Sequence, residues 1–179
     1  MLPAPTQEIQ SRIVEFLQGI GIAVREGAIP GESFLPGVVI EKGELILDRA
    51  RNTWPGDLLH EAGHLAVLPF ALRRTVGGDL PDTVLAEHAG EPEATAWAYA
   101  ALREIGLPPE VLFHEGGYGG KAAGLLFTYG AGVYPGLQVF PPRAWRLPPK
   151  RQDRAAPRPI PPCCAGFVLK LSRARAARQ

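Results

Sequence analysis

The segment His60-Glu61-Ala62-Gly63-His64 constrains the fold of this chain more than any other part of the sequence. It lies within residues 55–66, where leucines and alanines recur at helical spacing until Pro69 ends the pattern. Residues four apart share one face of a helix, so both imidazoles can point to the same place. Any further side chain that joins the two imidazoles must therefore come from a second element that packs across that face of the helix.

These five residues also carry a specific chemistry. Imidazole nitrogens are good ligands for zinc, and a glutamate beside the first histidine can exchange protons with water on the ion. Two ordinary histidines on a partly buried helix face are the alternative interpretation. The chain has only 4 histidines, and two of them stand at ligand spacing around a glutamate. We therefore expect His60 and His64 to bind Zn²⁺ and Glu61 to act as general base.

A hydrolytic zinc ion takes three protein ligands and keeps a fourth position for water. The continuation HExxHxxGxxH is absent, because Val67 stands where its glycine would be, so the third ligand must come from another element. The next long helix is predicted from Glu91 to Ile105, and Gly106 follows as a C-terminal stop. Glu91 and Glu93 in its first turn can each supply the missing carboxylate. A cap favoured by the helix dipole is the structural alternative for this acidic turn.

The other patterns predict an α+β domain with a small antiparallel sheet. A helix over residues 6–18 begins at the cap Thr6, and strands follow over residues 20–29 and 38–48, with Lys42-Gly43 as a hairpin turn. Residues 70–90 are loop-like with a short helix near residues 84–88, and further short helices are expected over residues 108–113 and 121–129. Gly63 inside a helix indicates close approach of a neighbouring element, while Trp97 and Tyr99 are expected in the core.

The C-terminal part differs sharply from the rest in composition. Residues 141–179 contain ten basic residues, one acid and eight prolines, although the whole chain has a net charge of only +1. We expect a domain over residues 1–140 and a basic, Pro-rich, poorly ordered tail over residues 141–179. The tail lacks interleaved aromatic residues, so a nucleic-acid partner is not expected.

Three further features bear on location. No run of about 18 apolar residues occurs and the N-terminus does not have the pattern of a signal peptide, so neither membrane insertion nor secretion is indicated. The two cysteines, Cys163 and Cys164, are adjacent and cannot join distant segments. A reducing, cytoplasmic location is the expectation.

The order of these motifs resembles the gluzincin metallopeptidases, which belong to the HExxH zincins. A helix, a hairpin, the HEAGH helix and a helix opening with E-x-E-A-x-x-W-A are most similar to the small ImmA/IrrE-like domain, over about residues 35–105. The resemblance implies a minimal zincin-like fold, with His60 and His64 as metal ligands and Glu61 as general base. It favours Glu91 over Glu93 as third ligand, because gluzincins often use E-x-x-x-D/N. Thr95 stands at the last position of that pattern, where the family usually has the Asp or Asn that orients the ligands.

The resemblance also directs attention to the loop around residues 114–118. Zincins often stabilise the oxyanion with a Tyr or His across the cleft, which makes Tyr118 and His114 candidates for contact with the oxyanion or substrate. A glycine-rich connector with one packed tyrosine is the structural alternative.

The function expected from these observations is a zinc-dependent hydrolase, in particular a peptidase acting on a peptide or protein. An extended substrate could pair with an exposed hairpin edge at residues 44–48. The alternatives are a zincin-like regulatory or interaction module that binds metal without turnover, and a nucleic-acid binder with a structural metal closed by a further ligand such as His88. The sequence does not indicate the oligomeric state.

Overall fold

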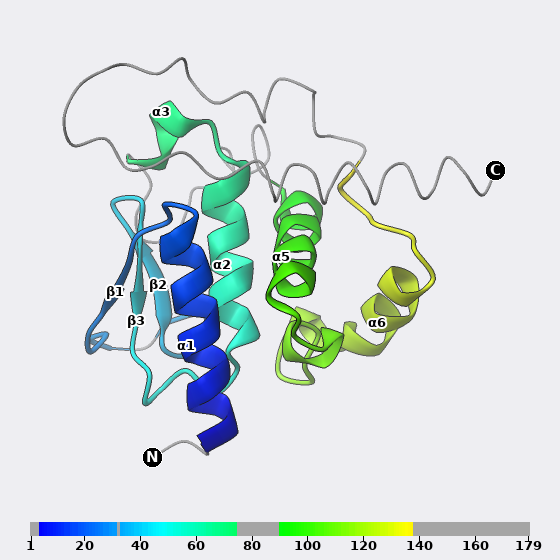
Figure 1. The fold of residues 1–179 in the computed structure, drawn as a ribbon, viewed down its shortest axis with the longest axis horizontal. Coiled ribbons are helices and arrows are strands. Elements are labelled where there is room, and N and C mark those ends of the chain that lie inside the picture. The colour runs from blue at the N-terminus through cyan, green and yellow to red at the C-terminus, as the bar shows by residue number, and fades with distance from the viewer. Residues whose placement is uncertain (1–3, 32, 75–89, 138–179) are drawn as a thin grey trace.

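The computed structural model describes residues 4–31, 33–74 and 90–137 of the 179-residue chain (Figure 1). The elements follow in this order: α1 (Ala4–Gly19), β1 (Val24–Glu26), β2 (Val38–Glu41), β3 (Glu44–Leu47), α2 (Gly56–Val67), α3 (Phe70–Arg73), α5 (Glu91–Ile105), the 3₁₀ turns η1 (Pro109–Val111) and η2 (Tyr118–Gly120), and α6 (Ala122–Gly130). The α+β class expected from the sequence is observed, with an N-terminal helix, a small sheet and several helices.

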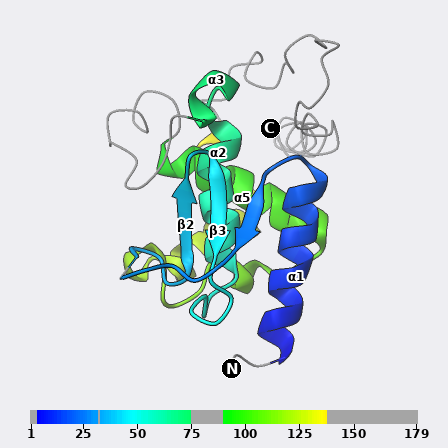
Figure 2. The ribbon, with the colours of Figure 1, turned by 90° about the vertical axis from the view of Figure 1, so that its left-hand side faces the viewer.

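The sheet is mixed, whereas the sequence predicted an antiparallel one. β2 and β3 form the expected antiparallel hairpin, and both turn residues, Lys42 and Gly43, have positive φ angles. β1 is shorter than predicted and pairs in parallel with β3, which gives the order β1-β3-β2 (Figure 2). Because β3 is the central strand, the expectation of a free edge at residues 44–48 is wrong. The outer strands are β1 and β2.

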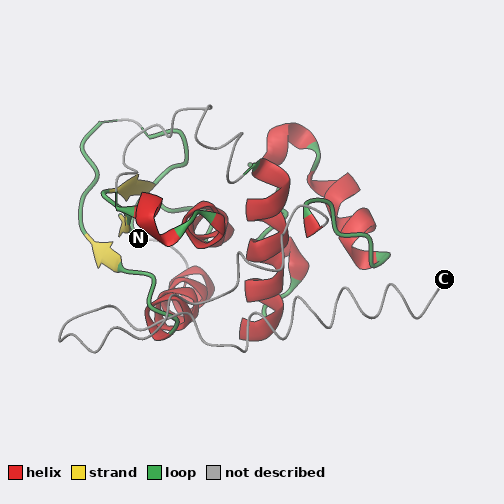
Figure 3. Ribbon diagram, turned by 90° about the horizontal axis from the view of Figure 1, so that it is seen from above, coloured by secondary structure: helices red, strands yellow, loops and turns green. Residues whose placement is uncertain are grey.

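Helix α2 lies at the centre of the described fold. It packs against the sheet and α1 on one side and against α5 on the other. The sheet and α6 lie at opposite ends of the described part of the chain in both Figure 1 and Figure 3. The core includes fully buried residues of α1, β3, α2 and α5: Ile13, Leu17, Leu45, Leu47, Leu58, Leu59, Leu65, Trp97 and Leu102.

The contact between α2 and α5 depends on a glycine. A Cβ atom added at Gly63 would collide with the backbone carbonyl of Ala94, so the two helices approach more closely than any side chain at this position would allow. The sequence-based interpretation of Gly63 as a site of close approach is confirmed. The approach brings the first turn of α5 beside the histidines of α2.

Several local predictions can be compared with the structure. Helix α1 begins at Ala4, so Thr6 lies inside the helix and is not its cap. Gly106 ends α5 in the left-handed conformation, as predicted, and Trp97 and Tyr99 are buried. The short helix near residues 84–88, His88 and the tail at residues 141–179 lie outside the described residues. Among the helices that are described, none is long and apolar enough to cross a membrane.

Candidate metal centre

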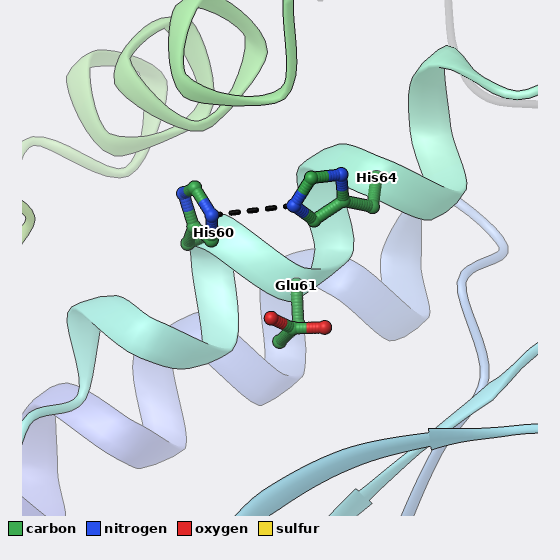
Figure 4. A group of neighbouring side chains, drawn as sticks. All are labelled: His60, Glu61 and His64. Carbon is green, nitrogen blue, oxygen red and sulfur yellow. Dashed lines mark hydrogen bonds between the residues drawn. The ribbon is translucent and has the colours of Figure 1, made fainter. Parts of the chain in front are cut away.

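His60 and His64 lie one turn apart on α2 and point their imidazoles toward each other. Their Nε2 atoms are 3.2 Å apart (Figure 4). The His64 side chain is buried, with 5% of its surface exposed, and that of His60 is 14% exposed. The helical spacing of the motif therefore places two nitrogen donors together on a largely buried face.

Glu91, the first residue of α5, reaches across to this pair. Its Oε2 atom lies 3.1 Å from His60 Nε2 and its Oε1 atom lies 3.3 Å from His64 Nε2. Glu93 is one of the two candidates from the sequence, but its carboxylate folds back against Gly90 at the start of the helix. Of the two carboxylates, Glu91 is the one that the packing of α5 on α2 brings to the histidines.

The spacing of these nitrogen and oxygen atoms can be compared with that of the ligands around a tetrahedral zinc ion. Two atoms bound about 2.0–2.1 Å from a tetrahedral zinc lie about 3.3 Å apart. The distances between the donors of His60, His64 and Glu91 are 3.1–3.3 Å. Two imidazole nitrogens with one carboxylate are also a ligand set that zinc uses in catalytic sites, where the fourth position is left to water.

Glu61 lies between the two histidines in sequence and extends from a different side of α2 (Figure 4). It still stays near them, because His60, Glu61 and His64 can place one ligand atom each within 4.8 Å of one another. Burial raises the pKa of the Glu61 carboxyl, and the charges of Glu91 and Asp57 add to this, while His64 and His60 oppose it. A raised pKa makes this carboxylate a better proton acceptor near neutral pH.

The pKa of Glu91 moves in the opposite direction. Hydrogen bonds from His60 and His64 lower the pKa of this carboxyl, although its side chain is 69% exposed. Two carboxylates whose pKa values are pushed apart by their surroundings are suited to different roles. Glu91 is suited to remain an anion beside cationic or metal-bound partners, and Glu61 is suited to exchange a proton.

The two candidates from the loop after α5 occupy different positions. The Tyr118 hydroxyl lies 3.4 Å from His60 Nδ1, so Tyr118 contacts one of the two histidines of the candidate metal centre. His114 is instead buried against the first turn of α2, where its Nε2 lies 2.9 Å from Asp57 Oδ1. The indole ring of Trp54 stacks on His114, with centroids 4.6 Å apart. His114 thus contacts Asp57 and not the donors of the metal centre.

Sequence reasoning missed three participants in this region. Neither Asp57 nor Trp54 stands out in the sequence as part of a functional site. Thr95 departs from the gluzincin pattern, and the sequence does not signal that its side chain opposes the rise in pKa that burial causes at Tyr118. Their partners are more than 20 residues away in sequence, so no local pattern signals these contacts.

Comparison of the chain with models of known protein families, with curated protein sequences and with solved structures found no match.

Proposed function

We propose that this protein is a zinc-dependent hydrolase of the gluzincin type, with His60, His64 and Glu91 as the metal ligands. One observation carries the proposal: potential ligand atoms from two helices converge at the spacing of a tetrahedral zinc site, beside a half-buried carboxylate at the general-base position. A zinc ion bound there would polarise a carbonyl group and lower the pKa of a coordinated water toward about 7.

Glu61 is the general base in this proposal. Its carboxylate accepts the proton of the attacking water and returns it to the leaving amine, so the residue ends the cycle in its starting state. The raised pKa of Glu61 supports both transfers, because a carboxylate that binds a proton more strongly than usual is the better acceptor and its conjugate acid is still able to return the proton.

A peptide is the proposed substrate class. One line of support is the resemblance of the HEAGH and E-x-E-A-x-x-W-A segments to small metallopeptidases. The other is that an outer strand, β2, lies against α2, the helix that carries both histidines. β2 packs on α2 and pairs with β3 along one edge, while its other edge carries among the described residues an isolated bridge between Leu35 and Val38 at the start of the strand. An extended peptide could add to the other edge of β2 by main-chain hydrogen bonds.

Elemental analysis of the purified protein tests the metal centre. We expect about one equivalent of zinc in the wild type and loss of most of it in His60→Ala, His64→Ala and Glu91→Gln. Glu93→Gln is the matched control, since it changes a carboxylate of the same helix turn and should retain zinc. Full occupancy in both histidine variants would place the metal elsewhere and refute the proposal.

A library of unstructured peptides tests the hydrolytic activity. We expect the zinc-loaded protein to cleave peptides. Cleavage should stop when a chelator removes the zinc and return when zinc is restored. A zinc-loaded wild type that cleaves no peptide in the library would instead favour the regulatory or interaction module, which shares the metal centre but lacks turnover.

A further inference from the structure

After α6 ends, the chain returns to the first turn of α5 (Figure 1). A Cβ atom added at Gly136 would overlap the carbonyl group of Pro92 and the nitrogen of Glu93, so the two backbones are in direct contact. Pro92 is the neighbour of Glu91, the carboxylate proposed as the third ligand. A segment much further along the sequence therefore touches the helix turn that carries a ligand.

The local sequence gives this segment a tight and stiff shape. Tyr134-Pro135-Gly136-Leu137 has proline second and glycine third, which is the order typical of a type II β-turn. The φ angle of Gly136 is +90°, as the third position of such a turn requires. The Leu137 NH donates to the Tyr134 carbonyl at 3.3 Å and closes the turn. Since proline fixes one of the backbone angles, the turn can press against α5 as a unit.

Aromatic rings anchor the turn to both α5 and α6. The ring of Tyr134 packs against Tyr99 of α5 and Tyr129 of α6, with centroids 5.9 Å and 5.6 Å apart. The Tyr129 hydroxyl also donates to the Pro135 carbonyl at 3.4 Å. Tyr99 and Tyr129 are themselves buried in the core. The core thus determines where Gly136 meets the helix.

The first turn of α5 depends on contacts with other elements. The first amide groups of a helix lack partners within it, so this turn frays most easily. Gly90, the residue before the helix, has no side chain to cap these groups. The Glu91 side chain is 69% exposed, so side-chain packing does little to orient it. Its direction toward the histidines therefore depends on the backbone contacts that fix the turn, that of Gly63 with Ala94 and that of Gly136.

We propose that the turn formed by residues 134–137 positions Glu91 at the metal centre, with Gly136 as the residue that permits the contact. The inference rests on the proposed metal centre. Gly136 acts through the backbone of Pro92 and Glu93, so it is a positioning residue. If the turn were pushed away, the start of α5 would move while the two histidines stay on α2. Changes that leave a ligand poorly oriented typically lower metal affinity by about 10–100-fold.

Gly136→Ala tests the proposal, because its methyl group would push the turn and α5 apart. We expect zinc binding, measured in competition with a chelator, to weaken by about 10–100-fold. Gly132→Ala is the matched control. Gly132 also has a positive φ, +78°, but among the described residues an added Cβ meets only the Tyr134 hydroxyl, at 3.9 Å. The control imposes the same kind of backbone strain without the collision, so it should leave zinc affinity unchanged.

A double variant shows whether Gly136 acts through Glu91. If the collision displaces only this ligand, Gly136→Ala should not weaken zinc binding further in a protein that already carries Glu91→Gln. The visible absorption of the cobalt-substituted protein is a spectroscopic readout of the ligand set. The spectrum of Gly136→Ala should approach that of Glu91→Gln. Equal losses of zinc affinity in both backgrounds would indicate general damage to the fold and overturn the inference.

A second variant and a zinc-free measurement complete the test. Pro135→Gly loosens the turn without adding an atom, so it should weaken zinc binding in the same direction even if Gly136→Ala does not fold. In the zinc-free protein, the amides of Glu93 and Ala94 donate to the residue before the helix. Their hydrogen exchange should be faster in Pro135→Gly than in the wild type and in the Gly132→Ala control.

The outcomes separate this inference from the proposed function. If the wild type binds zinc and a folded Gly136→Ala binds it equally well, the inference is overturned while the metal centre stands. Where Gly136→Ala does not fold, unchanged zinc affinity in Pro135→Gly overturns it. If the wild type binds no zinc, the proposed function fails, and hydrogen exchange alone decides whether the turn holds the start of α5.

Discussion

Glu61 and its two neighbouring histidines show how one turn of helix separates chemical roles. The imidazoles meet on one side of α2, while Glu61 extends from another side and is half-buried. Glu61 lies near the histidines and has a raised pKa. Glu91 contacts both histidines directly through its carboxylate, and its pKa is lowered. The residue type is the same, and the surroundings determine which function each carboxylate can have.

Glu61→Gln separates these roles by experiment. The amide keeps the size of the side chain but accepts no proton at neutral pH, so hydrolysis should fall by about 10²–10⁴-fold. Zinc content should remain near that of the wild type, because Glu61 is not a proposed ligand. Peptide cleavage and elemental analysis of the same sample provide the measurement. Equal losses of zinc and activity would make Glu61 a ligand.

At the scale of elements, the close contact between α2 and α5 is what brings Glu91 to the histidines. Gly63→Ala would push its methyl group into the Ala94 carbonyl, so the helices must separate. We expect the free energy of unfolding to drop by about 1–3 kcal/mol and zinc affinity to fall with it. Denaturant unfolding and chelator competition measure the two effects.

A matched control is available in α6. A Cβ added at Gly124 meets nothing within 4 Å, so Gly124→Ala should be neutral or stabilise the protein by up to about 1 kcal/mol. Destabilisation by both alanines would point to a general effect of the substitution and not to the contact of α2 with α5.

A second contact between elements depends on pH. Arg49 forms two hydrogen bonds to Glu26 of β1, at 2.7 and 2.8 Å, and these bonds and its charge lower the pKa of the Glu26 carboxyl below 4.5. Above pH 4.5 the ionised carboxylate favours the folded state. As the pH falls through the lowered pKa this contribution disappears, since the unfolded chain takes up the proton first.

Glu26→Gln should therefore reduce the free energy of unfolding at pH 7 and have a diminishing effect as the pH falls below 4.5. The reduction should be at most about 1 kcal/mol, because the Glu26 side chain is 52% exposed and solvent screens the pair. Urea unfolding at several pH values is the measurement. Arg49→Gln added to the same variant should cost little more, and a large further loss would show that Arg49 acts through other contacts.

At the scale of the whole molecule, the proposed ligands lie on two helices that are separate in sequence, so an ion bound to them would stabilise the fold as a unit. Zinc at 100 times its dissociation constant should add about 2.7 kcal/mol to the free energy of unfolding. For a chain of this size the midpoint of thermal unfolding should rise by roughly 5–10 °C. Calorimetry with and without a chelator measures the shift, and His64→Ala should not respond to zinc.

The sequence alone determined the features that depend on local spacing. Residues 60–64 predicted a helix with both imidazoles on one face, and the turn residues Lys42 and Gly43 predicted the hairpin. Gly106 marked the end of α5. These features follow from backbone preferences and from periodicity within a few residues, so they can be derived without knowledge of the rest of the chain.

The tertiary structure decided everything that depends on contacts between distant segments. It brought Glu91 and not Glu93 to the histidines, set β1 parallel to β3, and placed Tyr118 behind His60. In each case the sequence allowed more than one partner at similar local cost. The close packing of α5 on Gly63 and the path of the chain after α5 determine which partners meet. Both are properties of the assembled core.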